Sequence, residues 1–172
     1  FRFEFNLGYS VPWGEWLIVP YTGYGYRYWK RGDSETDGMV AFVREDYSWH
    51  YIPVGIRAFI PLGEGLSIEP HAAARFMFGG KMTAYLTDID PNYSDDPTFN
   101  LGNKPGWYVE MPLRYALDGN WSLALTPWYE YSAIGKSGVE RVRYGQSMVR
   151  GFYEPSSTTH QYGFNLGVGY SF

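Results

Sequence analysis

Apolar and polar residues alternate along most of this chain with a period of two. The segment 1–11 places apolar side chains at odd positions and polar or small ones at even positions. The segment 159–172 repeats this pattern, with glycine, asparagine and serine opposite bulky aromatic and aliphatic residues. Because successive side chains of a strand point to opposite faces, each segment predicts a β-strand with one apolar face.

The same period predicts several more strands, joined by connections of two very different lengths. The expected strands are 1–11, 16–30, 47–62, 66–79, 107–117, 121–133 and 159–172. Short glycine-containing turns fall at 12–15, 63–65 and 118–120, and long polar loops at 31–46, 80–105 and 134–158. Turns and loops alternate, so one end of the sheet should carry the turns and the other end the loops.

Composition favours a sheet with its apolar face outward. Aromatic residues make up 20% of the 172 residues, yet the mean hydropathy is −0.34, and the bulky aromatics stand opposite glycine, arginine and glutamate. No run approaches the roughly 18–20 apolar residues of a membrane-spanning helix, and 21 glycines argue against long helices. We therefore predict a single all-β domain, 1–172, folded as a transmembrane antiparallel up-and-down β-barrel.

The last strand carries the most specific pattern. Its alternating apolar set is Phe164, Leu166, Val168, Tyr170 and Phe172. Within an alternation that covers nearly the whole chain, this set resembles the small bacterial outer-membrane β-barrel proteins, the group that includes the OmpA membrane domain and OmpX. The resemblance implies an integral outer-membrane protein with extracellular long loops, periplasmic short turns and a periplasmic C-terminus. It also implies that the barrel-assembly machinery recognises the last strand.

The strand count departs from that family. Such barrels have an even number of strands with both termini periplasmic, whereas seven strands are expected here. Counting back from a periplasmic Phe172, the strand at Phe1 runs inward from the outside, so an upward strand should precede it. Either an N-terminal strand is missing from this chain, or one of the long loops hides further pairing. We favour eight strands with an N-terminal piece missing.

Period-two alternation sends many ionisable side chains to the inner face. The predicted lumen charge network comprises Arg27, Arg57, Glu69, His71, Arg75, Glu110, Arg114 and Glu130. The alternation also sends Arg2 and Glu4 to this inner face. An eight-stranded barrel has an interior that side chains fill, so these charges must pair. Residue counts from the short turns place Arg57 near Glu69 and His71.

A second charged group is expected at another height of the same interior. The residue counts place Arg75 near Glu110, with Glu130 beside Glu110. Two interpretations of both groups are open: a polar plug that holds the barrel shut, and a narrow ion path. We favour the plug.

The three histidines are the candidates for catalysis. His71 shares its face with Glu69, a pair suited to general-base work, but a structural histidine in a salt-bridge network is the interpretation we favour. His50 and His160 each follow a serine by a few residues. Lipid A deacylases of the outer membrane use Ser, His and Glu, but their His-x-Ser order is absent here, and omptin-like proteases need a longer chain. We predict no catalytic residues and no enzyme.

The loop 86–100 is rich in carboxylates, the oxygen ligands that Ca²⁺ prefers. The acids are Asp88, Asp90, Asp95 and Asp96. Their spacing does not match the EF-hand template, so we favour ordinary loop acidity over a calcium site. The chain has no cysteine and hence no thiolate metal site, and we predict no cofactor.

The net charge of the chain and its distribution limit the classes of partner that we expect. The net charge of −4 and pI near 5.3 exclude a nucleic-acid partner, because phosphate neutralisation needs a basic patch. The long loop 134–158 is locally basic and could contact lipopolysaccharide phosphates through Lys136, Arg141, Arg143 and Arg150. Outer-membrane lipid, lipopolysaccharide, the assembly machinery and an unidentified extracellular ligand are therefore the expected partners.

These observations predict a structural or surface-interaction barrel. Its long extracellular loops would present the binding surface, and paired charges would fill its lumen. Two alternatives stay open: a narrow, porin-like solute or ion channel, and a lipid A-modifying hydrolase.

Overall fold

The computed structural model describes residues 1–37, 40–117 and 120–170. These residues form strands and no helix, and none of them lies in a helix long and apolar enough to cross a membrane. The long strands are β1 (Arg2–Gly8), β3 (Trp16–Arg31), β6 (Glu45–Gly63), β8 (His71–Ala84), β10 (Pro105–Glu110), β12 (Trp121–Ile134) and β15 (Ser157–Tyr170). Shorter strands are β2 (Val11–Trp13), β4 (Glu35–Asp37), β5 (Val40–Phe42), β7 (Leu66–Ile68), β9 (Thr98–Asn100), β11 (Leu113–Ala116), β13 (Glu140–Tyr144) and β14 (Met148–Phe152).

The main sheet is an antiparallel meander that follows chain order. β1 and β2 both pair with β3. β7 and β8 both pair with β6, and β10 and β11 both pair with β12. The order across the sheet is therefore β1/β2, β3, β6, β7/β8, β10/β11, β12 and β15. Each of the strands expected from the alternation has a counterpart in this order, so those seven predictions are confirmed.

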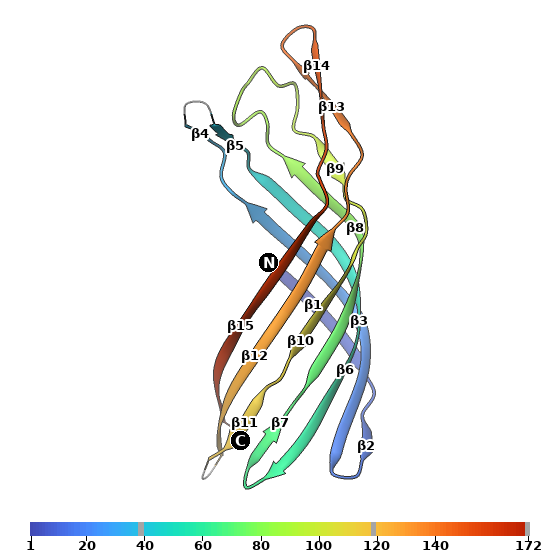
Figure 1. Ribbon diagram of the computed structural model, residues 1–172, viewed down its shortest axis with the longest axis vertical. Helices are drawn as coiled ribbons and strands as arrows, with labels where there is room; N and C mark the ends of the chain where they lie inside the picture. The colour runs from blue at the N-terminus through green and yellow to red at the C-terminus, as the bar shows by residue number, and fades with distance from the viewer. Residues whose placement is uncertain (38–39, 118–119, 171–172) are drawn as a thin grey trace.

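The short turns gather at one end of the sheet, here called the turn end, and the long connections at the other, the loop end (Figure 1). Trp13 pairs with Trp16 across a two-residue turn in which Gly14 has φ of +61°. In the turn 63–65, Gly63, Glu64 and Gly65 all have positive φ, and the two glycines adopt it without strain. The expected turn at 118–120 lies partly outside the described residues.

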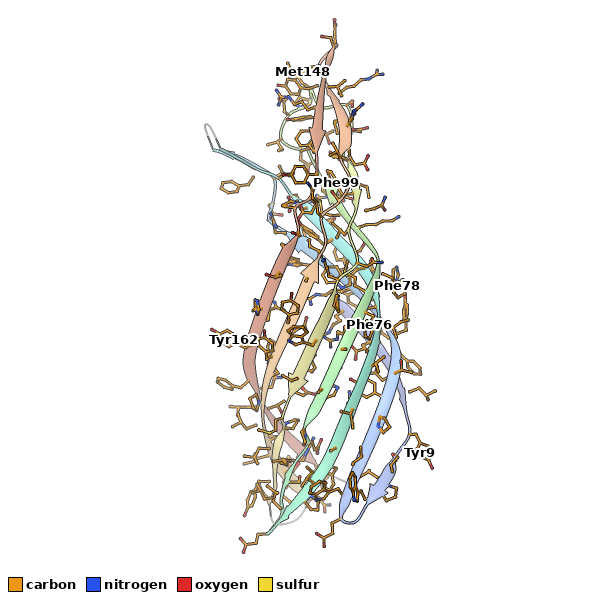
Figure 2. All side chains as sticks on the ribbon, turned by 45° about the vertical axis from the view of Figure 1, so that its right-hand side comes forward. Tyr9, Phe76, Phe78, Phe99, Met148 and Tyr162 are labelled. Carbon is orange, nitrogen blue, oxygen red and sulfur yellow. The ribbon has the colours of Figure 1, made fainter. Side chains whose placement is uncertain are left out.

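The sheet curls so that side chains from distant strands meet on one face, here called the inner face. Glu130 of β12 contacts Arg2 of β1, and Arg27 of β3 contacts Gln161 of β15, although neither strand pair is adjacent. The opposite, outer face carries the bulky apolar side chains, which project away from the sheet as Tyr162 does (Figure 2). The predicted apolar outer face is thus confirmed, whereas the inner face carries buried aromatic and methionine side chains as well as the predicted charges.

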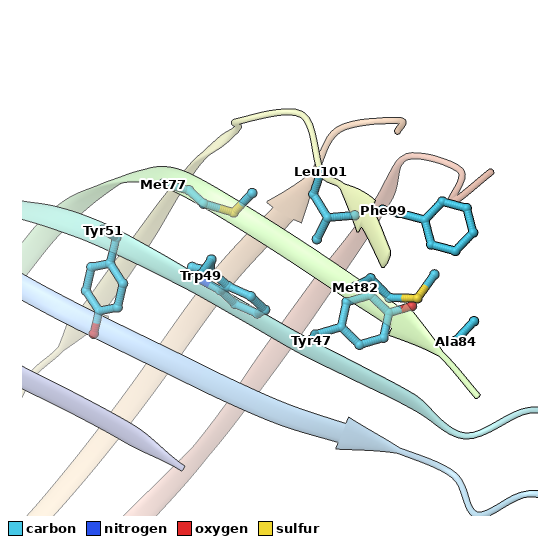
Figure 3. Close-up of a cluster of buried hydrophobic side chains, with 8 residues drawn as sticks. All are labelled: Tyr47, Trp49, Tyr51, Met77, Met82, Ala84, Phe99 and Leu101. Carbon is cyan, nitrogen blue, oxygen red and sulfur yellow. The ribbon is translucent and has the colours of Figure 1, made fainter. Parts of the chain in front are cut away.

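The loop end is more structured than the sequence indicates. The segment 31–46 contains the β4–β5 hairpin, 80–105 contains β9, and 134–158 contains the β13–β14 hairpin. The long loops thus contain strand pairing that the alternation does not reveal. The apolar plug, shown in Figure 3, comes from β6, β8 and the segment 99–101 and is made of Tyr47, Trp49, Tyr51, Met77, Met82, Ala84, Phe99 and Leu101. Val43, Ile134 and Phe152 of the other segments pack against it.

Candidate functional site: the inner-face ion pairs

One buried carboxylate gathers three arginines on the inner face. Glu130 Oε2 accepts hydrogen bonds from Arg2 Nη1 at 2.5 Å and from Arg75 Nη1 at 2.9 Å. Its other oxygen, Oε1, accepts one from Arg27. Arg75 reaches a second acid, Glu4, whose Oε2 lies 3.1 Å from Nη2. These five residues, from four strands, are here called the arginine–glutamate cluster.

Two members of this cluster are largely buried, so removing one of their partners should be costly. The Glu130 side chain is 6% exposed and that of Arg75 is 12% exposed. Charges that leave water lose hydration, and only close, hydrogen-bonded partners offset that loss. Arg75 also lies 4.8 Å from the centre of the Tyr108 ring, a cation–π contact. The cluster therefore ties β1, β3, β8 and β12 together across the interior.

Glycine opposite tyrosine gives this cluster its room. Glu4, Gly25 and Tyr51 are register partners on β1, β3 and β6, and the Tyr51 hydroxyl donates to Glu4 Oε2 at 2.8 Å. Its ring lies directly over Gly25, where an added Cβ would stand 2.1 Å from Cζ of the ring. A side chain at position 25 would thus push the Tyr51 ring out of its place. Gly25 therefore supplies the space that the Tyr51 ring occupies.

A second group lies nearer the turn end and centres on His71. Glu110 Oε1 lies 2.9 Å from His71 Nδ1, and the other ring nitrogen contacts the Tyr21 hydroxyl. Tyr108 donates to Glu110 Oε2 at 2.6 Å. His71 is thereby held at both nitrogens inside a polar network, which is the structural role that we favour.

Nearest the turn end, Glu69 accepts a hydrogen bond from Arg114 Nε at 2.9 Å, in a pair that is much more exposed than the arginine–glutamate cluster. Glu69 thus forms its ion pair with Arg114, while Arg57, Glu69 and His71 line one common pocket. Arg57 does face His71 in the strand register, as predicted, and its guanidinium lies 5.3 Å from the centre of the Tyr21 ring.

The predicted proximity of Arg75 to Glu110 is wrong. Arg75 pairs in register with Gly106, and Glu110 pairs with His71, four residues nearer the turn end. Neighbouring strands of a tilted sheet are offset from each other, and residue counts from separate turns ignore that offset. The expected separation into groups at different heights is correct.

All three histidines make hydrogen bonds to tyrosine hydroxyls. Besides His71, His50 Nδ1 lies 2.6 Å from the Tyr24 hydroxyl, and His160 Nδ1 lies 2.7 Å from that of Tyr129. Each histidine thus bonds to a tyrosine, and no serine–histidine hydrogen bond occurs within the described ranges.

The acidic loop does not assemble into a metal site. Asp96 accepts from Thr87, Asp90 accepts from Asn92 and Tyr144, and Asp88 lies 3.8 Å from Arg44. Over the part of the chain that the structure describes, no three acidic or histidine side chains converge as metal ligands would. Asp88, Asp90, Asp95 and Asp96 are therefore not brought together as a calcium site.

A small cavity lies between the arginine–glutamate cluster and the apolar plug. The cavity left there is about 30 Å³ and is lined by Arg75, Glu130, Trp49 and Met77 among others. That volume holds one or two water molecules at most. Larger openings of about 450 and 370 Å³ lie to one side, between the β1/β3 and β12/β15 parts of the sheet.

The basic loop extends from the loop end as the β13–β14 hairpin. Val142 is buried, whereas Arg141 and Arg143, its neighbours on the strand, are exposed on the other face. Arg150 stacks on the Tyr144 ring at 4.2 Å, and Lys136 lies 4.3 Å from that of Tyr153. Of the four predicted basic residues, two thus present their charge outward and two lie over aromatic rings.

A buried acid fastens this hairpin to the sheet. Glu154 is 6% exposed, its Oε1 lies 2.8 Å from the Tyr47 hydroxyl, and Glu45 Oε2 lies 2.9 Å from that same hydroxyl. The phenol has a single hydrogen, so it cannot donate to two carboxylates at once. Burial raises the pKa of Glu154, and the nearby Glu45 charge raises it further.

The docking of this hairpin should weaken as the pH rises. The pKa of Glu154 is higher in the docked hairpin than its ordinary value of 4.5. The protonated carboxyl therefore stabilises docking fully at a pH below 4.5, and this stabilisation is lost as the pH rises through the higher pKa of the docked state. Hydrogen exchange in segment 137–154, corrected for intrinsic rates, should therefore increase across that range. In Glu154→Gln the increase should vanish, and an unchanged pH profile in that variant would contradict this role.

No protein-family model matches the chain, and no curated protein is significantly similar to it.

Proposed function

We propose that this chain is a transmembrane β-barrel of a bacterial outer membrane, closed with eight strands, that acts without catalysis or conduction. Its long loops form an extracellular platform for surface interactions, and its interior is a sealed plug. The observation that carries the proposal is the arrangement of one apolar outer face around an inner face filled by ion pairs. The arrangement is opposite to that of a water-soluble sheet protein, which keeps its charges outside.

The spacing of aromatic residues on the outer face supports membrane insertion. Trp121 packs on Tyr170 at the turn end with ring centres 4.9 Å apart, and Trp107 stacks on Tyr131 near the loop end at 4.2 Å. Trp121 and Tyr131 are ten residues apart on β12, which spans roughly 33 Å along a strand. At a tilt of about 40° this becomes roughly 25 Å, the height of the apolar band of outer-membrane barrels.

The residues between these aromatic belts support the same interpretation. On β15 the outward side chains Tyr162, Phe164, Leu166 and Val168 are all at least 68% exposed. Soluble monomers rarely expose so continuous an apolar surface, because water contact costs free energy over its whole area. Lipid chains are the cover that would remove this cost. Phe172 of the expected assembly signal lies outside the described residues.

The interior supports a sealed barrel more than a channel. The arginine–glutamate cluster crosses it, and the apolar plug follows directly toward the loop end. An ion on this path would have to displace buried ion pairs and then cross buried aromatic and methionine side chains. Both steps are costly in a medium of low polarity.

The loop end supports a surface-interaction role. The Ser94 amide donates to the Arg143 carbonyl at 3.0 Å, and the Gly145 amide donates to the Asn92 carbonyl at 2.9 Å. These bonds join two long loops into one structured platform, from which Arg141 and Arg143 point outward. We propose phosphate groups of lipopolysaccharide as their partners.

Conductance in planar lipid bilayers tests this proposal. The purified chain should insert, become protected from protease except at the loops, and show no steady current. Sustained cation- or anion-selective openings would instead establish the porin-like alternative. Release of acyl chains from lipid A by the same preparation would establish the hydrolase.

A further inference from the structure

The main sheet has two edges whose hydrogen-bonding groups face the same opening. Within the described residues, β1 forms its ladder with β3 alone, and β15 with β12 alone. Both β1 and β15 are more exposed than the strands between them, on both faces of the sheet. A closed barrel leaves no such edges, because every strand has two neighbours.

Strand direction determines what can close this opening. All neighbouring strands are antiparallel, and six pairings separate β1 from β15 in the sheet order, so these two strands run in the same direction. Direct closure would therefore create a parallel pair in a sheet that is otherwise antiparallel. One additional strand, running from the turn end to the loop end, is antiparallel to both edges.

The opening has room and polar walls for such a strand. The cavity of about 450 Å³ is lined on one side by Arg2 and Arg27 and on the other by Gln161 and Asn165. The cavity of about 370 Å³ continues it toward the loop end, between Trp29 and Thr159. Both cavities are therefore lined by residues from the two edges of the sheet. The inward-facing side chains of an added strand would lie in these cavities.

The charges of the arginine–glutamate cluster do not balance. The arginine–glutamate cluster contains three arginines but only two glutamates, Glu4 and Glu130. The other charges of the predicted network on this face, Arg57 and Arg114 against Glu69 and Glu110, cancel. One positive charge is thus left over, and Arg2 and Arg27 carry it to the wall of the larger cavity.

We propose that the edges of β1 and β15 bind one further β-strand, antiparallel to both, whose inner face brings a carboxylate to Arg2 and Arg27. Its alternate, outward residues are apolar and continue the outer surface between Phe3 and Tyr162. The proposal rests on the proposed function, because a barrel is what such a strand would close. It goes further in specifying which two edges the strand joins and the acidic residue on its inner face.

Cross-linking tests the width of the opening. Arg27 pairs with Arg2 and donates to Gln161, so the outward neighbours Phe3 and Tyr162 lie at similar heights. The chain has no cysteine, so Phe3→Cys/Tyr162→Cys introduces a clean pair. One intervening strand puts these positions roughly 10 Å apart, too far for a disulfide but within reach of a bismaleimide of that length.

The control pair is Phe5→Cys/Tyr24→Cys, which are register partners on adjacent strands and should form a disulfide. We expect the test pair to be bridged by the bismaleimide and not by a disulfide. A disulfide in the test pair would mean that β1 and β15 meet directly. Failure of both reagents would mean an opening wider than one strand, and cross-links between chains would mean that a second copy fills it. Each of these results would overturn the proposal.

Peptide binding tests the chemistry of the occupant. Labelled eleven-residue peptides of alternating valine and threonine, with one central inward glutamate or with lysine in its place, are added to the chain in phosphatidylcholine vesicles. The glutamate peptide should bind on the order of tenfold more tightly, the effect of one charge-assisted hydrogen bond. In Arg27→Gln, which removes the surplus charge, this preference should disappear.

Equal affinity of the two peptides, or no binding of either, would overturn the acidic-strand proposal. Loss of the glutamate preference in inorganic phosphate would show a site for free anions and would overturn it too. Membrane insertion is measured separately, by protease protection of the same vesicles. A chain that inserts but takes up no peptide contradicts this inference alone, whereas a chain that fails to insert contradicts the proposed function.

Discussion

The substitution Glu130→Gln should lower the free energy of unfolding by about 3–5 kcal/mol, the usual cost of removing one side of a buried ion pair. Glu130 is the common acceptor of Arg2, Arg27 and Arg75, and its side chain is 6% exposed. A neutral amide would leave three guanidinium groups close together with Glu4 as their remaining acid. Urea unfolding from lipid vesicles, followed by tryptophan fluorescence, measures this loss.

The matched control is Glu69→Gln, the same chemical change on the same inner face. Glu69 has one arginine partner and a side chain that is 33% exposed, so its loss should stay below about 1 kcal/mol. Adding Arg27→Met to Glu130→Gln removes one unpaired charge and should recover part of the stability. If the two single variants lose equal stability, the cluster is not a buried network.

The strands of this fold can be read from the sequence because a one-residue shift would move every apolar side chain to the wrong face. Strand β15 shows this most clearly, since glycine and asparagine alternate there with large apolar residues. The turns at 12–15 and 63–65 are equally readable, because their glycines take backbone angles that other residues avoid. Local sequence determines these features.

The partners of the inner charges could not be read in the same way. Arg57 and His71 were placed correctly because a short turn connects their strands and sets their register. Arg75 and Glu110 were misplaced because a long loop joins their strands, and only the tilt of the whole sheet sets the offset. Register across long loops is therefore a property of the assembled sheet.

Inner aromatic residues were missed for a different reason. Tyr21 and Tyr51 have the same odd-numbered parity as the inner glycines, so alternation alone places them inside. Their phenol groups bond to His71 and Glu4, and their rings occupy the space that Gly55 and Gly25 leave. Tyrosine is also common at membrane interfaces, so a tyrosine in the sequence does not by itself indicate an inner position.

The substitution Leu166→Arg should cost about 2–4 kcal/mol of unfolding free energy if the outer face lies in lipid. Leu166 pairs with Leu125 on β12 and lies between Tyr162 and Tyr170, near the middle of the proposed apolar band. Its side chain is 77% exposed, so in a water-soluble protein the same change would cost within about 0.5 kcal/mol. The large value therefore requires lipid around the sheet. Urea titration in phosphatidylcholine vesicles measures it.

The matched control places the same arginine on the same face of β15 but outside the band. Thr158 is an exposed, outward residue beyond His160, toward the loop end, so Thr158→Arg should cost no more than about 1 kcal/mol. Both variants carry one arginine substitution on the same strand. Subtracting their losses of unfolding free energy therefore cancels the effect of arginine on the unfolded chain. If Leu166→Arg costs as little as Thr158→Arg, the outer face of β15 lies in water, and the membrane assignment fails together with the barrel function that rests on it.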